Sequence, residues 1–224
     1  MSEKQTRLSA SRTPPVTCST SSSAVKFAVD SKAIYHRKMS SKESQRLTFD
    51  LQPILVGELL ELRPLQSDDF DQLYAAASDP LIWEQHPESD RYTPTVFRQY
   101  FDGALKSKGA LAILDRSSGR MIGSSRYWNY DPDAREVEIG WTFLERAYWG
   151  GKFNRELKRL MLDHAFKYIE RVLFIVGSNN LRSRKAVEKI GGKLVREFER
   201  PNRHGAMEKN VVFALDRAAW EAAK

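Results

Sequence analysis

From about residue 59 onward, hydrophobic residues recur with two periods, one typical of strands and one typical of helices. Residues 59–65 (LLELRPL) alternate between apolar and polar positions and end at a proline, which predicts a strand. Two helices are expected next, the second beginning near Pro94, because proline is favourable in the first helical turn. Their apolar faces comprise Phe70, Leu73, Tyr74 and Ala77 in the first helix, and Phe97, Tyr100, Phe101 and Leu105 in the second.

The rest of the chain predicts further strands and two more helices. Strands are expected at residues 110–115, 120–130, 135–143, 171–176, 193–199 and 208–216. A helix is expected after the glycines at 150 and 151, with Leu157, Leu160, Met161, His164 and Tyr168 on its apolar face. Its polar flank is expected to comprise Lys152, Arg155, Lys158 and Arg159. Residues 179–192 predict a capped helix with a glycine stop, so the order β-α-α-β-β-β-α-β-α-β-β indicates a mixed α/β sheet.

The strand at 135–143 (REVEIGWTF) alternates strictly and leads toward the glycine pair. One face is expected to carry Val137, Ile139 and Trp141, and the other Glu136, Glu138 and Gly140. This places Glu138 on the polar face of that strand.

Charge divides the chain into two parts. Residues 1–48 hold nine Lys/Arg against three Asp/Glu, whereas residues 49–224 hold 27 against 26. A nucleic-acid-binding domain usually carries its basic residues on the fold, so nucleic acid is an unfavoured partner. The first segment is Ser/Thr-rich and lacks periodicity, which predicts a flexible tail at 1–48 before a single domain at 49–224. Alternatively, the tail is a targeting segment, or an artefact upstream of a true start at Met39.

Several classes of protein are excluded by composition. Cys18 is the only cysteine, so neither an intrachain disulfide nor a cysteine-based metal site is expected. No apolar run approaches the ~20 residues of a membrane span. No His, Asp or Glu cluster has metal-ligand spacing, so no metal is expected. The sequence therefore predicts a globular cytoplasmic protein.

The segment RAYWGGKF (146–153) places two glycines directly before a helix. A helix N-terminus carries unpaired N–H groups and partial positive charge, so it attracts phosphate. Gly150 and Gly151 leave the backbone bare there, and Lys152 and Arg155 add positive charge. The alternative is a simple turn before a helix whose basic residues are solvated. Neither a Walker loop nor a dinucleotide fingerprint is present.

Two ordered motifs lie on either side of this helix. The first is Glu138–Trp141 (EIGW) followed by Tyr148–Gly150 (YWG), and the second comprises Asn180, Ser183, Glu188, Lys189 and Gly191. Together they resemble the acyl-CoA-binding half of GNAT N-acetyltransferases, in particular the RimJ/RimL-like branch. The resemblance covers about residues 55–216 and implies a central twisted, mostly antiparallel sheet of about six or seven strands flanked by about four helices.

One position departs from the family pattern. The family loop usually reads Gln/Arg-x-x-Gly-x-Gly/Ala, whereas here Ala147 holds the first position and Lys152 the last small one. A lysine there either crowds a pyrophosphate or contacts it, and the sequence leaves both alternatives open.

The resemblance implies direct transfer of an acetyl group from acetyl-CoA, the cosubstrate, to a primary amine. The acceptor is either a protein N-terminus or a small amine such as a polyamine, amino sugar or amino acid. The backbone near Phe143 and Leu144 is expected to bind pantetheine and polarise the thioester carbonyl. The remaining residues expected to line the acyl-CoA site are Trp149, Gly150, Gly151, Lys152, Phe153, Asn154, Asn180 and Ser183.

Catalytic roles follow from the same resemblance. Glu138 is the candidate base for the amine, with Glu136 second, and Ser183 is the candidate acid for the departing thiolate. The alternatives are a salt-linked surface carboxylate for Glu138 and a plain helix N-cap for Asn180. Trp149 and His164 are interpreted as core residues, whereas His86 and His204 are candidates for the acceptor site. Two further classes stay open: an inactive or regulatory acyl-CoA-binding relative, and a protein associated with nucleic acid through its basic tail. The sequence does not indicate an oligomeric state.

Overall fold

The computed structural model describes residues 48–224. Except for Thr48, the predicted tail at 1–48 lies outside the described residues, as do Cys18 and Met39.

Eight strands form one sheet in the order β1-β2-β3-β4-β5-β6-β8-β7. They are β1 (Leu55–Val56), β2 (Leu60–Pro64), β3 (Ala110–Asp115), β4 (Met121–Asp131), β5 (Glu136–Leu144), β6 (Arg171–Gly177), β7 (Lys193–Pro201) and β8 (Met207–Asp216). All neighbouring strands are antiparallel except β5 and β6, which are parallel. The mostly antiparallel sheet is confirmed. The expected strand number was too low because β1 has only two residues, too few to show a period.

The α-helices are α1 (Phe70–Ala77), α2 (Pro94–Lys106), α3 (Lys152–Ala165), α4 (Leu181–Glu188) and α5 (Arg217–Ala222). Short 3-10 turns occupy Ser67–Asp69, Pro80–Ile82 and Arg146–Tyr148. The predicted order of elements is confirmed, and α2 begins at Pro94 as expected. The expectation of about four helices omitted α5, which has six residues, none of them buried, and therefore presents no apolar stripe.

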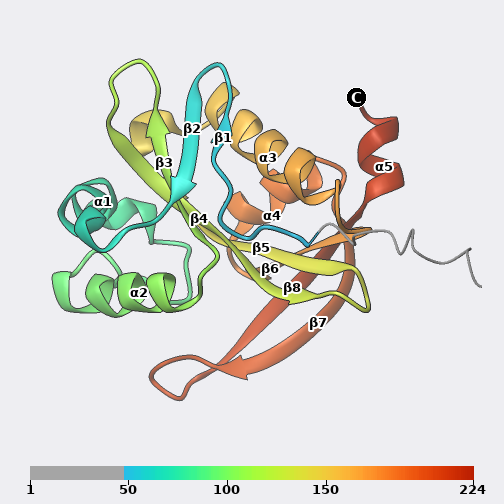
Figure 1. The fold of residues 1–224 in the computed structure, drawn as a ribbon. Helices are drawn as coiled ribbons and strands as arrows, with labels where there is room; N and C mark the ends of the chain where they lie inside the picture. The colour runs from blue at the N-terminus through green and yellow to red at the C-terminus, as the bar shows by residue number, and fades with distance from the viewer. Residues whose placement is uncertain (1–47) are drawn as a thin grey trace, which may run out of the picture. The chain divides into compact units, whose positions relative to one another are not determined.

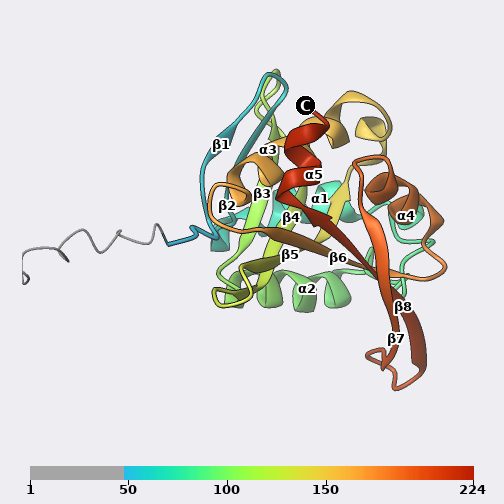
Figure 2. The same ribbon diagram turned by 90° about the vertical axis from the view of Figure 1, so that its right-hand side faces the viewer.

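Helices cover both faces of the sheet (Figure 1). On one face, Leu157, Met161 and Leu162 of α3 pack with strand residues that include Val137 and Ile139. On the other face, α1 and α2 enclose a second core that contains Phe97, Phe101 and Phe143. The hairpin of β7 and β8 extends beyond the rest of the sheet (Figure 2). His164 is buried, with its Nε2 2.8 Å from the carbonyl oxygen of Asp50, so its interpretation as a core histidine is confirmed.

Strand β5 contains a bulge at Trp141. Between the partners of Ser124 and Arg126, β5 advances from Phe143 to Gly140 and so has one more residue than β4. Trp141 absorbs this insertion with a positive φ of 51°. Its ring lies 5.7 Å from that of Trp128 and packs against the second core, away from Val137 and Ile139. The predicted face of Trp141 was therefore wrong, because the bulge interrupts the alternation.

Candidate active site

The sheet opens between β5 and β6. The two strands pair only from Glu136 and Arg171 to Glu138 and Leu173. Beyond that point, β5 pairs with β4 alone and β6 with β8 alone. Their facing edges therefore carry backbone N–H and C=O groups without a strand partner, and such groups require hydrogen bonds from elsewhere. The two strands therefore diverge beyond the pair Glu138 and Leu173.

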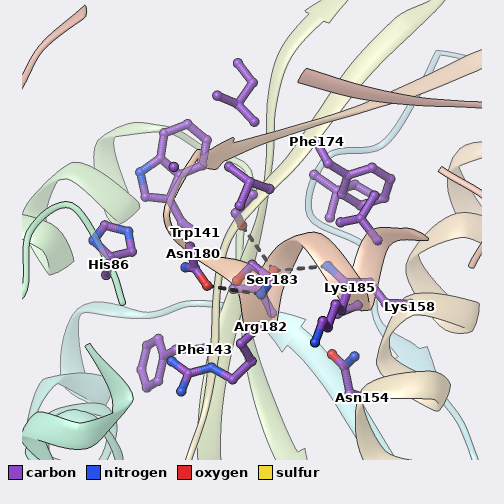
Figure 3. Close-up of a pocket in the computed structure, with 18 of the residues that line it drawn as sticks. His86, Trp141, Phe143, Asn154, Lys158, Phe174, Asn180, Arg182, Ser183 and Lys185 are labelled. Carbon is purple, nitrogen blue, oxygen red and sulfur yellow. Dashed lines mark hydrogen bonds between the residues drawn. The ribbon is translucent and has the colours of Figure 1, made fainter. Parts of the chain in front are cut away.

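A cavity of about 1720 Å³ occupies this opening. It is lined by residues of β5, β6, α3, α4, β8 and the C-terminal end of the chain, by the segment before α2, and by the end of β7 with the loop after it. Figure 3 shows side chains from several of these elements around it, among them His86, Lys158 and Ser183. Pockets for single small ligands are typically about 300–1,000 Å³, so this one has room for two reactants.

The glycine turn lies at one end of this cavity. Gly150 and Gly151 have φ angles of 73° and 64°, a region that side-chain-bearing residues rarely adopt. Gly151 is the N-cap of α3, and a Cβ built at either glycine would meet no atom within 4 Å. The space in front of the helix N-terminus is thus open, which suits an anionic ligand.

The residues in the first turn of α3 differ in whether they line the cavity. Asn154 and Arg155 line the cavity, whereas Lys152 and Phe153 do not. The ring of Phe153 packs edge-on against Tyr148 at 4.9 Å, and Lys152 Nζ lies 5.3 Å from the centre of the Phe153 ring. Neither side chain lines the cavity, so only the backbone N–H groups of Lys152 and Phe153, at the start of α3, are left as candidate ligand contacts.

Lys158 is a buried cavity residue that sequence reasoning missed. Of the predicted polar flank, Lys152, Arg155 and Arg159 are exposed, but Lys158 is only 6% exposed and lines the cavity. Its Nζ donates to Thr142 Oγ1 at 3.3 Å, and burial lowers its pKa from 10.5 to about 8. A signal was present in the sequence: Lys158 lies four residues before Leu162, a buried position on the same helical stripe.

Glu138 lines the cavity from β5 and is 6% exposed. Burial raises its pKa from 4.5 to about 7, although the guanidinium groups of Arg200 and Arg126 and a hydrogen bond from Asn129 Nδ2 at 3.2 Å act against this rise. Among residues 48–224 it forms no ion pair, so the alternative of a salt-linked surface carboxylate is not supported. Glu136, the second candidate, pairs with Arg171 at 3.2 Å and does not line the cavity.

Asn180 and Ser183 lie together at the start of α4. Asn180 Oδ1 accepts the Ser183 backbone N–H at 3.0 Å, which confirms the N-cap interpretation. Both residues also line the cavity, as Figure 3 shows. Capping uses only the side-chain oxygen of Asn180, so the amide nitrogen and the serine hydroxyl are compatible with a second role in ligand binding.

Phe143, Leu144 and Trp149 form the wall between the cavity and the two cores. The Phe143 ring lies 5.1 Å from that of Trp83, and Leu144 belongs to the other core. Because the side chains of Phe143 and Leu144 are buried in the cores, the backbone groups of these two residues are the part suited to ligand binding. Trp149 Nε1 donates to the carbonyl oxygen of Leu144 at 2.8 Å, and Trp149 packs against both cores. Its interpretation as a packing residue is therefore supported.

The far side of the cavity carries a histidine held by its neighbours. His86 Nδ1 accepts the Glu88 backbone N–H at 2.9 Å, and its Nε2 lies 3.0 Å from Arg91. Burial, reinforced by the Arg91 charge, lowers the pKa of His86 well below its ordinary value. His204 is exposed and does not line the cavity, so only His86 of the two candidates is brought to the site.

Two classes of site are absent from the described part of the chain. Residues 48–224 contain no group of three or more His, Cys, Asp or Glu residues that could hold a metal ion. Over the same range, every helix is too short or too polar to span a membrane.

The family of this chain follows from comparing its sequence with models of known protein families. Residues 60–193, more than half of the 224-residue chain, match the model of the acetyltransferase (GNAT) domain. The chain belongs to the GNAT acetyltransferase family. The matched range runs from β2 to the start of β7 and includes Glu138, Lys158 and Ser183, so the GNAT fold is confirmed.

Solved structures share this GNAT fold at low identity. A GCN5-related N-acetyltransferase from Brucella melitensis is 23% identical, with a TM-score of 0.69 over 76% of this chain and 81% of that one. A GNAT-family acetyltransferase from Bacillus anthracis is 19% identical, with a TM-score of 0.61 over 73% and 98%. RimJ of Mycobacterium smegmatis, in complex with CoA-disulfide, is 18% identical, with a TM-score of 0.57 over 71% and 82%. Among curated proteins, none matches the sequence.

Proposed function

We propose that this GNAT protein transfers the acetyl group of acetyl-CoA directly to a primary amine. The observation that carries the proposal is the opening between β5 and β6, which leads to the glycine-capped N-terminus of α3. Coenzyme A joins a pyrophosphate to a long arm that contains amides. A helix N-terminus suits the pyrophosphate, and unpaired strand backbone suits the amides. The CoA-disulfide held by the RimJ neighbour supports the same assignment.

The donor contacts follow from this geometry. The N–H groups of the segment from Gly150 to Asn154 hold the pyrophosphate, and the backbone of Phe143 and Leu144 pairs with pantetheine. Asn180 and Ser183 contact the arm from α4. Backbone N–H groups aimed at the thioester oxygen would stabilise the negative charge that develops there during attack.

Glu138 is the proposed base. The attacking amine must be neutral, and at pH 7 deprotonation costs an α-amine roughly 1 kcal/mol but a lysine side chain roughly 4–5 kcal/mol. A pKa of about 7 lets the Glu138 carboxylate accept the proton of the amine, directly or through water, near neutral pH. The pKa of Glu138 is therefore closer to that of an α-amine than to that of a lysine side chain, so an α-amine is the better matched acceptor.

Thermal unfolding with and without acetyl-CoA tests the donor site. A ligand at ~100 times its dissociation constant adds about 2.7 kcal/mol to stability, which a melting scan resolves. The wild type, Gly151→Asp and Gly151→Asn are compared, each against its own melting temperature. Both variants share the strain of a positive φ at position 151, so only the charge distinguishes them. We expect a shift in the wild type that Asp removes and Asn retains in part.

The outcomes separate the candidate functions. No acetyl-CoA shift in the wild type would contradict the proposal. An acetyl-CoA melting shift without release of CoA in the presence of any amine would instead favour the inactive or regulatory relative. The lysine at position 152, where the family pattern has a small residue, is the observation that favours this alternative. The amine panel comprises peptides with free N-termini, spermidine, an amino sugar and free amino acids. A preference for peptides would place the chain in the RimJ/RimL-like branch.

A further inference from the structure

Lys158 sits in the gap between the two diverging strands. Its Nζ lies 3.3 Å from Thr142 Oγ1 on β5 and 5.2 Å from the centre of the Phe174 ring on β6. Phe174 directly follows the last β5–β6 pair, Glu138 and Leu173, and Thr142 lies four residues beyond it along β5. Figure 3 shows Lys158 extending from α3 toward the side of the cavity that holds Ser183. A ligand that threads the opening must therefore pass this ammonium group.

The ammonium is poorly satisfied by the protein. An ammonium group has three donors, and within residues 48–224 Lys158 forms one hydrogen bond and no ion pair. Burial alone accounts for its lowered pKa, although many other charged groups line the cavity: Glu88, Arg91, Glu138, Arg155, Arg159, Asp163, Arg182, Lys185, Glu188, Lys189, Arg200, Arg203, Glu208 and Lys224. In the described part of the chain its partners are the Thr142 hydroxyl and the Phe174 ring, and neither neutralises a buried charge, so packing does not explain this lysine.

We propose that Lys158 is the proton donor to the sulfur of the departing CoA, a catalytic role that rests on the proposed acetyltransferase function. The amine nitrogen attacks the thioester carbonyl carbon, and the C–S bond breaks with its electron pair on sulfur. Glu138 takes a proton from the amine, and Lys158 gives one to the sulfur. Water then returns the proton from Glu138 to Lys158, so the step is balanced without a further reactant.

This assignment displaces Ser183 from the role of acid. An alkyl thiol such as cysteine has a pKa near ~8.5, and a proton donor works best when its own pKa is close to that of the group it serves. A serine hydroxyl is a far weaker acid and serves as a hydrogen-bond donor. Ser183 therefore positions the arm or a water molecule, and Lys158 supplies the proton.

The test compares Lys158→Met with the wild type and with Lys167→Met, which removes an exposed lysine just after α3 and outside the cavity lining. Steady-state kinetics use acetyl-CoA and the best amine of the panel. We expect Lys158→Met to fold with an equal or higher melting temperature and to retain the acetyl-CoA shift. Its kcat should fall about 100-fold, within the range for loss of a general acid. The decrease of the wild-type kcat above about pH 8 should disappear.

A second readout does not depend on turnover. The thiol of bound CoA, followed by thiolate absorbance, should ionise at lower pH in the wild type than in Lys158→Met, because the ammonium stabilises the thiolate. Equal thiol ionisation, or a Lys158→Met kcat within about threefold of the wild type, would overturn the proposal. Acetylation of Lys158 itself, detected by mass spectrometry, would also overturn it. A wild type that binds acetyl-CoA but acetylates no amine would instead contradict the proposed function, so the two failures are distinguishable.

Discussion

At the scale of single residues, burial moves the pKa values of two groups in one cavity toward each other. It raises the pKa of Glu138 to about 7 and lowers that of Lys158 to about 8. Desolvation disfavours the charged form in both cases, and that form is the deprotonated acid but the protonated amine. Between these values, the carboxylate can accept a proton while the ammonium can donate one. This combination suits an acyl transfer in which one proton leaves the amine and another reaches the sulfur.

Glu138→Gln removes the base and keeps the shape of the side chain. We expect kcat to fall at least about 100-fold at pH 7.5, because a positioned general base typically contributes that much. In the wild type, kcat should rise with pH through about 7 as the carboxyl ionises, and the variant should lose this rise. Glu136→Gln is the control, since Glu136 is outside the cavity lining. An unchanged pH profile in Glu138→Gln would assign the base to another group.

Lys158→Met should also change the pH dependence of stability. The folded pKa of about 8 lies below the ordinary value of 10.5, so the folded state binds fewer protons than the unfolded state between these values. Below pH 8 the buried ammonium therefore costs the wild type roughly 3 kcal/mol, and this cost decreases as pH rises toward 10.5. Urea unfolding at several pH values should show the variant more stable at pH 7, with the difference shrinking by pH 10. A less stable variant at pH 7 would indicate a structural lysine.

At the scale of elements, α3 also holds the loop between β1 and β2. The Glu156 carboxylate accepts the backbone N–H groups of Glu58, Leu59 and Leu60 at 2.7, 2.8 and 2.9 Å. Glu156→Ala should lower the free energy of unfolding by roughly 2–4 kcal/mol, because three N–H groups, that of buried Leu60 among them, lose a charged acceptor. Urea unfolding checks this against Asp102→Ala, a half-exposed carboxylate 4.0 Å from Arg98, for which less than about 1 kcal/mol is expected. Similar losses in both variants would show that the loop does not depend on Glu156.

The same scale shows what the sequence could and could not predict. The long strands and helices were predictable because each has enough residues to display a period and a boundary residue, as Pro94 does for α2. The bulge at Trp141 was not, since a positive φ at tryptophan has no local sequence signal. The Glu138 environment depends on Asn129 from β4 and on the opening beside β6, so its burial arises only from tertiary structure. The spacing of Lys158 from Leu162 indicated the buried stripe of α3, but its partners lie on β5 and β6, which are distant in sequence.

At the scale of the whole molecule, the excess of positive charge and the cavity lie in different parts of the chain. Residues 49–224 hold 27 basic and 26 acidic side chains, and the cavity lies within this part. A chain that starts at Thr48 should therefore keep the acetyl-CoA melting shift of the full chain. It should lose any salt-dependent binding to duplex DNA that the full chain shows at low salt, because the excess of basic residues precedes position 48. Fluorescence anisotropy over a salt series measures this, with a slope of about −0.9 per neutralised phosphate. An unchanged slope in the shortened chain would contradict this prediction and would place the DNA-binding surface on the GNAT fold, despite its nearly neutral net charge.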